Sequence, residues 1–392
     1  MEKQFIILNF SHGNGPQLRT TEVALALNDE REKRGASRMG IIVPWVYQER
    51  QKTIFKENFK TFLKWHPDEI IFVRDFENIL AKPLFYERDS YVAWLKRFVD
   101  TQRGVEENVK TFVRGPMRGE TIDGRAVEVP AGAIALCISR YPIVDFGITP
   151  SYHVSFAYNS EILKKALQAG IAHLPPEIAQ KAIGMYETIE EKQALHCIAE
   201  PATFLREKDT PLYESEVLTP PNARQYTNSK TLWPMRKGIY VSMTGIPGMK
   251  HLFEELSYSA YRTYTHKTGW LPGSIKASPS ILANKNILLH FARVGWGSAW
   301  LSFYTETPLV MMPYQESDDL EVYFNNQSLE RAGLGREYRG ESIEELLEWG
   351  NEYKKAVREK KNELIEKYGT LDGVWYTARA IDERYRQSID ER

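Results

Sequence analysis

One pattern occurs twice in this chain and constrains its fold most strongly: a short apolar strand followed at once by a turn that contains glycine. FIILNF at residues 5–10 precedes SHGNG, and GIYVSM at residues 238–243 precedes TGIPG. After each copy, segments of helical composition alternate with further apolar segments. These further strands are expected at residues 40–45, 69–73, 133–139, 286–291 and 308–313. Strands that alternate with helices form parallel, doubly wound sheets, so the sequence predicts an α/β protein with two such sheets.

The chain length of 392 residues also favours two domains, because one hydrophobic core rarely serves so long a chain. Residues 208–235 are rich in proline and polar residues, which is typical of a linker. Residues 104–131 are expected to leave the core, and residues 160–205 to be mostly helical. The expected organisation is a first domain at 1–220, a linker at 221–236, a second domain at 237–370 and a last helix at 371–392, with helix breaks at Gly369 and Gly373.

Charge and cysteine content exclude several classes of protein. The 51 basic and 52 acidic residues give a formal charge of −1, which argues against a nucleic-acid partner. Cys137 and Cys197 stand alone without a C-x-x-C pair, so neither a zinc site nor a redox motif is supported. The N-terminus has no signal-peptide pattern, and no apolar run reaches the ~18 residues that span a bilayer. The sequence therefore predicts a cytoplasmic protein.

The two glycine turns are candidate ligand loops. In doubly wound sheets, ligands bind beyond the carboxyl ends of the strands, where backbone amides at helix N-termini meet phosphates. The first half offers Gly13, Asn14 and Gly15 there, and the second half offers Gly245 and Gly248. Two such loops that face each other predict an enzyme with a cleft between its domains.

A more specific pattern extends over residues 270–335. It consists of WLPG at 270–273, ILLHFARVGWGSAW at 287–300, TPLVMMPYQESDD at 307–319 and NNQSLERAGLG at 325–335. This pattern resembles the nucleotide-sugar-binding half of GT-B glycosyltransferases, in particular the UDP-glycosyltransferases and the peptidoglycan lipid-linked N-acetylglucosaminyltransferase. The segment GWGS at 295–298 is similar to the G-W-N-S core of that family, and two prolines follow at the family's spacing. The resemblance implies two Rossmann-like domains that face an interdomain cleft, and a last helix that crosses back to the first domain.

The resemblance and the chemistry of the side chains name the same donor site. Gly295 and Gly297 would let backbone amides approach a diphosphate, and Ser298 would add a hydroxyl. Arg293 stands where the glucosyltransferases carry histidine, and a guanidinium can bind phosphate bidentately. The alternative for Arg293 is a structural ion pair. The expected donor-binding residues are Gly245, Trp270 for the base, Arg293, Gly295, Gly297, Ser298, and Gln315, Asp318 and Asp319 for the hydroxyls of the sugar.

Three positions depart from the family pattern. Leu301 occupies the position of the ribose-binding glutamate, and Gly273 that of a glutamine. In the first domain, SHGNGPQLRT resembles a family loop whose histidine serves as catalytic base or contacts the acceptor. Pro16 occupies the position of that histidine. His12 lies four residues earlier and is our candidate catalytic base, because a histidine titrates near neutral pH.

Other residues of the first domain remain candidates beside His12. Gly13, Asn14, Gly15 and Arg19 would form an acceptor or phosphate loop, with Arg19 facing a phosphate or carboxylate of the acceptor. Glu22, Asp145 and His153 are alternative bases, and the sequence does not rank them.

These residues predict a glycosyltransferase, inverting or retaining, that moves a sugar from a nucleotide-sugar donor, UDP-linked by resemblance, to a hydroxyl acceptor. No Asp-x-Asp occurs in the chain, so neither a metal nor another cofactor is expected. One alternative is a catalytically inactive GT-B protein that binds a nucleotide or activates a partner glycosyltransferase. Another is a sugar-nucleotide epimerase, which would need convergent carboxylates such as the acidic run at 316–321.

A basic stripe suggests a membrane partner. Lys52, Lys56, Lys60 and Lys64 recur every four residues, with aromatic side chains between them. On a helix this composition is typical of an interfacial segment, so residues 48–65 predict peripheral contact with the inner membrane face. The resemblance to GT-B enzymes, some of which carry such a face and use lipid-linked acceptors, implies a lipid-linked acceptor here. The alternative is a helix whose phenylalanines pack on the sheet and whose lysines point to solvent.

Overall fold

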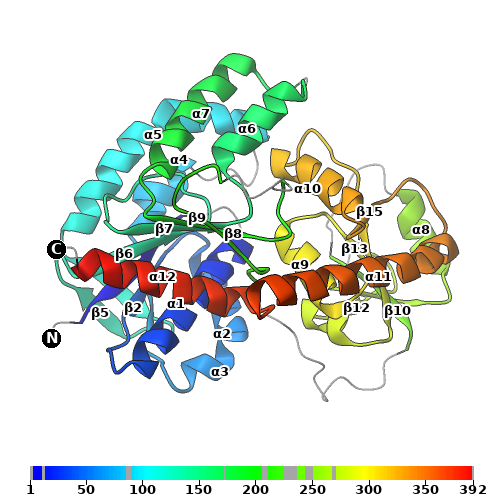
Figure 1. Cartoon of the computed structure of the whole chain (residues 1–392), viewed down its shortest axis with the longest axis horizontal. Coiled ribbons are helices and arrows are strands. Elements are labelled where there is room, and N and C mark those ends of the chain that lie inside the picture. Colours follow the sequence, from blue (N-terminus) through cyan, green and yellow to red (C-terminus); the bar gives the residue numbers. More distant parts are fainter. Residues whose placement is uncertain are drawn as a thin grey trace. The chain divides into compact units, whose positions relative to one another are not determined.

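The computed structural model describes residues 3–10, 14–84, 90–171, 173–204, 211–223, 236–242, 250–266 and 271–390. These residues form two compact units. The first unit takes the described residues of 1–201, 206–222 and 373–392, and the second takes those of 202–205 and 223–372. Neither unit is therefore one continuous piece of chain, and Figure 1 shows both of them coloured along the sequence.

The described strands of the first unit form a nine-stranded sheet in the order β5-β4-β3-β2-β1-β6-β7-β8-β9. Their bounds are β1 (Phe5–Leu8), β2 (Gly40–Pro44), β3 (Ile70–Val73), β4 (Met117–Thr121), β5 (Ala126–Val129), β6 (Ile134–Ser139), β7 (Ser151–Ser155), β8 (Leu195–Ala199) and β9 (Glu216–Thr219). All neighbours are parallel except where β4 meets β3 and β5. The chain leaves β1 toward β2 and later returns to place β6 on the other side of β1.

Helices cover both faces of this sheet. They are α1 (Asn14–Lys33), α2 (Gln48–Asn58), α3 (Lys60–Leu63), α4 (Lys82–Leu84), α5 (Tyr91–Arg114), α6 (Asn159–Gln168), α7 (Pro176–Glu190) and α12 (Gly373–Asp390), with a π-helical turn at Glu77–Ala81. All four residues of β1 are buried, as expected for a strand that is covered on both faces. Figure 1 shows α12 beside α1 on one face, and α5, α6 and α7 on the other.

The second unit contains a six-stranded parallel sheet in the order β12-β11-β10-β13-β14-β15, as far as the described residues show. The strands are β10 (Gly238–Val241), β11 (Arg262–Thr265), β12 (Ile275–Lys276), β13 (Ile287–Ala292), β14 (Leu309–Met311) and β15 (Arg336–Glu337). The helices are α8 (Lys250–Tyr258), α9 (Trp296–Thr305), α10 (Leu320–Arg331) and α11 (Ile343–Tyr368), with a 3₁₀ turn at Pro279–Ala283.

The end of the chain contains both expected helix breaks. A capping box of Ser342 and Glu345 begins α11, and Gly369 ends it in the left-handed conformation with a φ of 71°. At Gly373, where α12 begins, a Cβ atom would collide with the carbonyl oxygens of Pro220 and Pro221. Glycine is therefore required at that position because the backbone of another segment lies against it.

Some expectations about local structure are wrong. Residues 104–131 do not leave the core: they contain the end of α5 and the hairpin of β4 and β5, which extends the sheet. The helices expected within 160–205 are confirmed, but β8 follows them and was not expected. β7 and β9 were also not expected. Helix α1 begins at Asn14 rather than near Thr20, so the supposed glycine loop lies partly in its first turn.

Candidate functional site

The most distinctive site of the second unit lies where its sheet changes direction. β10 and β13 are neighbours; the chain continues outward from β10 to β11 and β12, and from β13 to β14 and β15. Ligands of doubly wound sheets bind at such a switch point, beyond the carboxyl ends of the strands. The loop 293–295, which joins β13 to α9, leaves the sheet at that point. The loop after β10, including Gly245, lies outside the described residues.

The N-terminus of α9 provides backbone donors there. Gly295 is the N-cap with a φ of −97° and a ψ of 156°. Apart from its chain neighbours and the backbone of its own helix, no atom lies within 4 Å of the place where a Cβ of Gly297 would be. Neither glycine needs a positive φ, so open space rather than backbone conformation accounts for them. The start of a helix carries partial positive charge. Of the amides there, the N–H of Ser298 already donates to the carbonyl of Gly295 at 3.0 Å. Together with the half-buried Ser298, this helix start suits an anion.

Three residues that the sequence proposed for donor binding lie together. The buried carboxylate of Asp318, whose side chain is 5% exposed, forms an ion pair with the Arg293 guanidinium, which is 41% exposed. Asp318 also accepts a hydrogen bond from the backbone N–H of Gln315 at 3.3 Å. Burial raises the pKa of Asp318, and the charge of Arg293 opposes that rise. Asp318 therefore holds Arg293 in place at the carboxyl ends of β13 and β14, while part of the guanidinium remains open.

Asp319, the next residue, is the N-cap of α10 and is half-buried. Its side chain does not cap the helix by a hydrogen bond. Its role as a contact of the donor sugar stays a prediction, as does that of Gln315.

A buried polar frame supports the loop after β13. The Asn325 side chain on α10 donates to the carbonyl of Val294 at 3.2 Å and accepts from the Thr203 hydroxyl at 2.9 Å. The indole N–H of Trp296 donates to the same hydroxyl at 2.9 Å. Trp296 is 1% exposed and packs on Trp300, so it belongs to the core of the second unit. The sequence predicts no role for Asn325 or Thr203, although NNQS at 325–328 is part of the resemblance.

A second polar contact connects the strands of the switch point to α9. His290 in β13 lies between two hydroxyls, with ring-to-oxygen distances of 2.7 Å to Ser242 and 2.6 Å to Ser302. Burial lowers the pKa of His290 to about 3, so the ring is neutral at physiological pH. The apolar run ILLHFA gave no signal for this site, because a histidine inside a strand is ambiguous in a sequence.

Leu301, at the position of the family's ribose-binding glutamate, points into the core. It packs with Tyr240, Tyr264 and Ile287 under the sheet and is 8% exposed. Residue 301 of this helix therefore does not face the switch point. Gly273 has a positive φ of 72°, which glycine adopts more easily than the family's glutamine. Trp270 lies outside the described residues.

The first-unit candidates are only partly described. His12 and Gly13 lie outside the described residues, as does the side chain of Asn14. Gly15 is exposed in the first turn of α1. Arg19 forms an ion pair with Glu22 at 2.5 Å, and both side chains are largely buried. Arg19 is thus already paired with a carboxylate of its own helix.

The three alternative bases are all engaged elsewhere. Glu22 pairs with Arg19 as described. Asp145 accepts from Lys110 and Lys192, each at 3.0 Å, and although burial alone would raise its pKa, these partners and the Gly147 amide hold it below its usual value. His153 is 1% exposed, and burial lowers its pKa well below its usual value. None of the three is an open, neutral-pH proton acceptor.

The basic stripe is divided between core and surface. Phe55 and Phe59 are buried in the core of the first unit, so neither is available to a membrane. Lys52 pairs with Glu120 at 2.7 Å. Lys56, Lys60 and Lys64 are exposed, and Trp65 next to them is 78% exposed.

The described residues contain neither a cluster of metal ligands nor a helix that could cross a membrane. No group of three or more His, Cys, Asp or Glu side chains within that part of the chain is arranged to hold a metal ion. None of its helices has the length and apolar character that a membrane crossing requires.

The fold is similar to those of several glycosyltransferases. TcCGT1, solved in complex with UDP, matches with a TM-score of 0.61 at 15% identity, over 98% of this chain and 100% of that one. UGT71G1 of Medicago truncatula, complexed with UDP-glucose, matches with a TM-score of 0.55 at 14% identity, over 98% of both chains. SnogD of Streptomyces nogalater matches with a TM-score of 0.56 at 13% identity, over 98% and 100%. No protein-family model and no curated protein matches the sequence.

The chain therefore has the GT-B fold of UDP-glycosyltransferases along nearly its whole length, and the fold predicted from the sequence is confirmed.

Proposed function

We propose that this protein is a glycosyltransferase that uses a nucleotide-activated sugar. The observation that carries the proposal is the set of anion-binding groups at the switch point of the second unit: the N-terminus of α9, the open glycine Gly297, and Arg293 held by Asp318. Such a set stabilises the negative charge that develops on a departing diphosphate.

The donor is best supported as a UDP-sugar. TcCGT1 was solved with UDP and UGT71G1 with UDP-glucose, and both have the fold of this chain. In our proposal the positive N-terminus of α9 at Gly297 and the Ser298 hydroxyl hold the diphosphate, and the open edge of Arg293 binds it through charge-assisted hydrogen bonds. These groups neutralise the leaving group without a metal, in agreement with the missing Asp-x-Asp in the sequence.

The acceptor is a hydroxyl that a base of the first unit deprotonates. Glu22, Asp145 and His153 are each paired or buried, which favours His12 among the candidates that the sequence offers. A histidine base would give a rate that rises with pH through its pKa.

Nucleotide binding tests the donor site directly. Thermal shifts of the full chain are measured against UDP, GDP, ADP and dTDP; a ligand at a hundred times its Kd stabilises by about 2.7 kcal/mol. We expect one diphosphate to raise the melting temperature, and Arg293→Ala or Ser298→Ala to weaken its binding about tenfold or more. Arg358→Ala is the matched control, because Arg358 also pairs with a carboxylate in the second unit, Glu306. Equal binding in all variants would contradict the assigned site.

Transfer is tested separately by incubating the protein with UDP-sugars and a panel of hydroxyl acceptors, and separating the products by mass spectrometry. We expect transfer or slow donor hydrolysis, with the loss of either in His12→Ala. Tight UDP binding without turnover would favour an inactive GT-B protein that acts on a partner. A changed sugar that remains attached to its nucleotide would favour an epimerase.

We also propose peripheral contact with a membrane that carries a lipid-linked acceptor. Trp65 and the exposed Lys56, Lys60 and Lys64 support it, since tryptophan and lysine are favoured at lipid interfaces. Flotation with phosphatidylglycerol vesicles should retain the protein, and Trp65→Ser should release it. Tyr258→Ser is the control, because Tyr258 is 89% exposed in the second unit. Equal recovery of all three proteins with anionic and neutral vesicles would refute the contact.

A further inference from the structure

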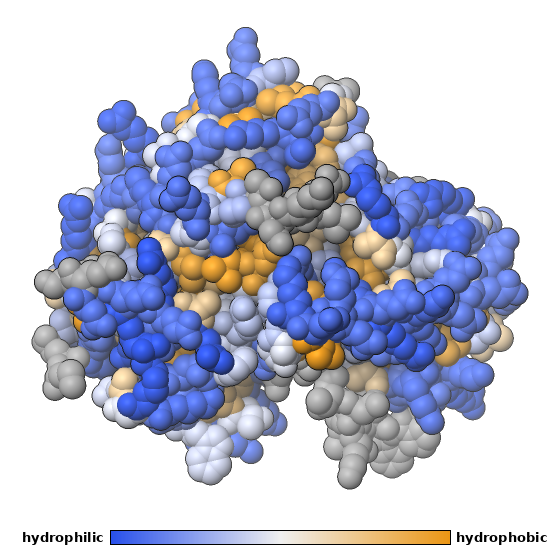
Figure 2. All heavy atoms as spheres, in the orientation of Figure 1, coloured by the Kyte–Doolittle hydropathy of each residue, from blue (hydrophilic) through white to orange (hydrophobic). Residues whose placement is uncertain are grey.

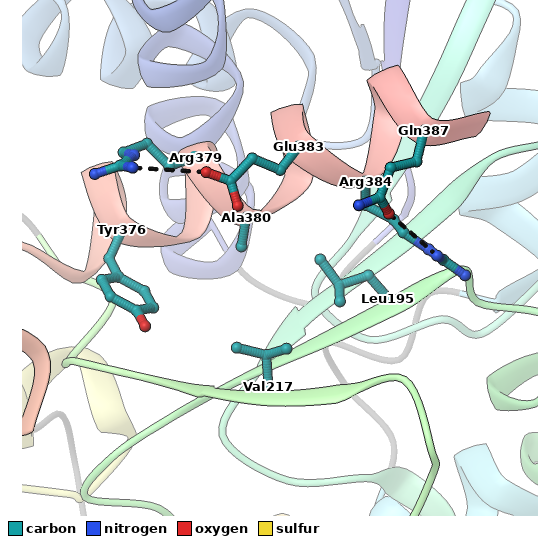
Figure 3. Close-up of a pocket in the computed structure, with 8 residues that line it drawn as sticks. All are labelled: Leu195, Val217, Tyr376, Arg379, Ala380, Glu383, Arg384 and Gln387. Atoms are coloured by element: carbon teal, nitrogen blue, oxygen red, sulfur yellow. Dashed lines mark hydrogen bonds and ion pairs between the residues drawn. The ribbon is translucent and has the colours of Figure 1, made fainter. Parts of the chain in front are cut away.

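The first unit contains a pocket of about 330 Å³ that no part of the proposed function uses. It lies between α12 and the strands β8 and β9. Its lining consists of Leu195, Val217, Tyr376, Arg379, Ala380, Glu383, Arg384 and Gln387 (Figure 3). Pockets of this size hold small organic molecules.

Helix α12 presents two different faces. Ala378, Ile381 and Tyr385 are buried in the core of the first unit. Tyr376 and Ala380 lie on another face of the helix. This face lines the pocket opposite Leu195 of β8 and Val217 of β9. In Figure 2 a hydrophobic area is visible where Figure 1 places β8 and β9, with hydrophilic side chains around it.

The floor of the pocket is apolar and its ends are polar. Leu195 and Val217 point from the strands toward Ala380 in Figure 3. Tyr376 lies at one end and Arg384 at the other, eight positions apart along the helix, which corresponds to about 12 Å. The pocket therefore suits an elongated molecule with an apolar body and a polar group at its end.

The charge at the Arg384 end indicates the sign of that polar group. Arg384 donates to the carbonyl of Ala194 and to the side-chain oxygen of Gln387, each at 3.3 Å, and both acceptors are neutral. No carboxylate of the described residues forms an ion pair with Arg384, whereas Arg379 is paired with Glu383 at 3.6 Å. An uncompensated guanidinium beside an apolar floor favours an organic anion.

We propose that this pocket binds a small organic carboxylate, with its apolar body on Leu195 and Val217 and its carboxylate at Arg384. The site is independent of the donor site, which lies in the second unit. The pocket is lined by β8, β9 and α12. The chain passes between the two units just after β8 and β9, near residues 202 and 223, and just before α12, near residue 372. A bound carboxylate would brace these elements against one another.

Binding is measured by ligand-observed NMR and calorimetry on the full chain, with phenylacetate as the probe and neutral phenylacetamide as its uncharged counterpart. We expect saturable binding of phenylacetate, and affinity lower by about tenfold or more for phenylacetamide and for Arg384→Gln, because a charge-assisted hydrogen bond is lost. Val217→Trp should abolish binding by filling the floor. Arg103→Gln is the control, because Arg103 is an exposed arginine of α5.

Two results would overturn the proposal. One is the absence of saturable phenylacetate binding to the unaltered protein. The other is equal phenylacetate affinity in Arg384→Gln and the unaltered protein. This comparison tests the proposal even if Val217→Trp fails to fold. Displacement of phenylacetate by UDP would show instead that the probe occupies the donor site.

Discussion

The two sheets have switch points of the same topology but of different chemistry. In the second unit, the loop after β13 has an exposed glycine, a helix N-terminus and a partly open Arg293. In the first unit, the loops after β1 and β6 are joined by a hydrogen bond of 2.8 Å from the Asn9 side chain to the Val144 carbonyl, and Arg19 is neutralised by Glu22.

This difference shows that topology provides a place for a ligand, while the side chains decide which ligand fits. Buried amides surround the start of α1: Gln51 donates to Gln17 at 2.8 Å and accepts from the Val46 amide at 2.9 Å. These amides are fully buried and bond to one another and to the backbone, whereas Arg293 in the second unit is partly exposed. Four experiments would break or sharpen this comparison.

The largest expected effect is a loss of stability in acid that is greater for the first unit. His153 and His196 are buried there, 3.2 Å apart through their ring nitrogens, and His290 is buried in the second unit. Burial lowers the pKa of His196 to about 4 and that of His290 to about 3, and it lowers that of His153 as well. Because each pKa is depressed in the folded state, the unfolded chain binds protons first as the pH falls below about 6.5, and stability decreases.

From pH 6.5 to 5 each histidine should cost about 1.6 kcal/mol, so about 3 kcal/mol in the first unit against about 1.6 kcal/mol in the second. Hydrogen exchange of β8 and β13 at both pH values, corrected for intrinsic rates, measures the two losses. His196→Asn should halve the loss in the first unit. Equal losses in the two units would contradict the assignment.

The next effect concerns the buried amides. Asn325→Ala and Gln51→Ala each leave buried backbone groups without their partner, so each should lower the free energy of unfolding by about 3 kcal/mol. Only Asn325→Ala should also weaken UDP binding, by about tenfold, because it releases the loop at Val294. Urea unfolding and UDP titration of both variants test this. The comparison fails if Gln51→Ala weakens UDP binding as much.

The two arginines of the switch points should behave differently. Arg293→Ala leaves the buried Asp318 without its cation and should cost about 1–2 kcal/mol of stability, together with UDP binding. Arg19→Ala breaks a pair within one helix and should cost less than about 1 kcal/mol, with UDP binding unchanged. Thermal melts with and without UDP measure both. Loss of UDP binding in Arg19→Ala would place the nucleotide elsewhere.

The smallest effect on stability is expected for Gly297→Ala. A Cβ meets no atom at that position, and alanine favours a helix, so stability should stay the same or rise by less than about 1 kcal/mol. The added methyl group would nevertheless occupy the space where a diphosphate approaches the amides. Isothermal titration with UDP should therefore show weaker binding by a more stable protein. Unchanged affinity would mean that the glycine serves no ligand.

The fold class and the strands that open each unit could be predicted from the sequence because those strands are continuous apolar runs. β7 and β8 were missed because His153 and His196 interrupt their apolar pattern, and a buried neutral histidine cannot be told from an exposed one in a sequence. The hairpin of β4 and β5 was missed because its strands carry charges such as Arg118 and Glu128 at the edge of the sheet.

For the proposed donor site, the resemblance implies Arg293 and Asp318 as separate contacts, with a structural ion pair as the alternative for Arg293. That the two bind each other follows only from the neighbouring carboxyl ends of β13 and β14, which join positions far apart in the chain. The role of Asn325 depends on the same kind of tertiary proximity.

The position of α12 limits how this chain can be truncated or recombined with a related one. Its apolar face completes the core of the first unit, yet it is encoded after the whole of the second unit. A fragment that ends before Gly373 would therefore expose the surfaces of α1 and β8 that α12 covers. An exchange of the first unit between two such proteins must therefore transfer both ends of the coding sequence, because a single crossover point would separate the first unit from its own final helix.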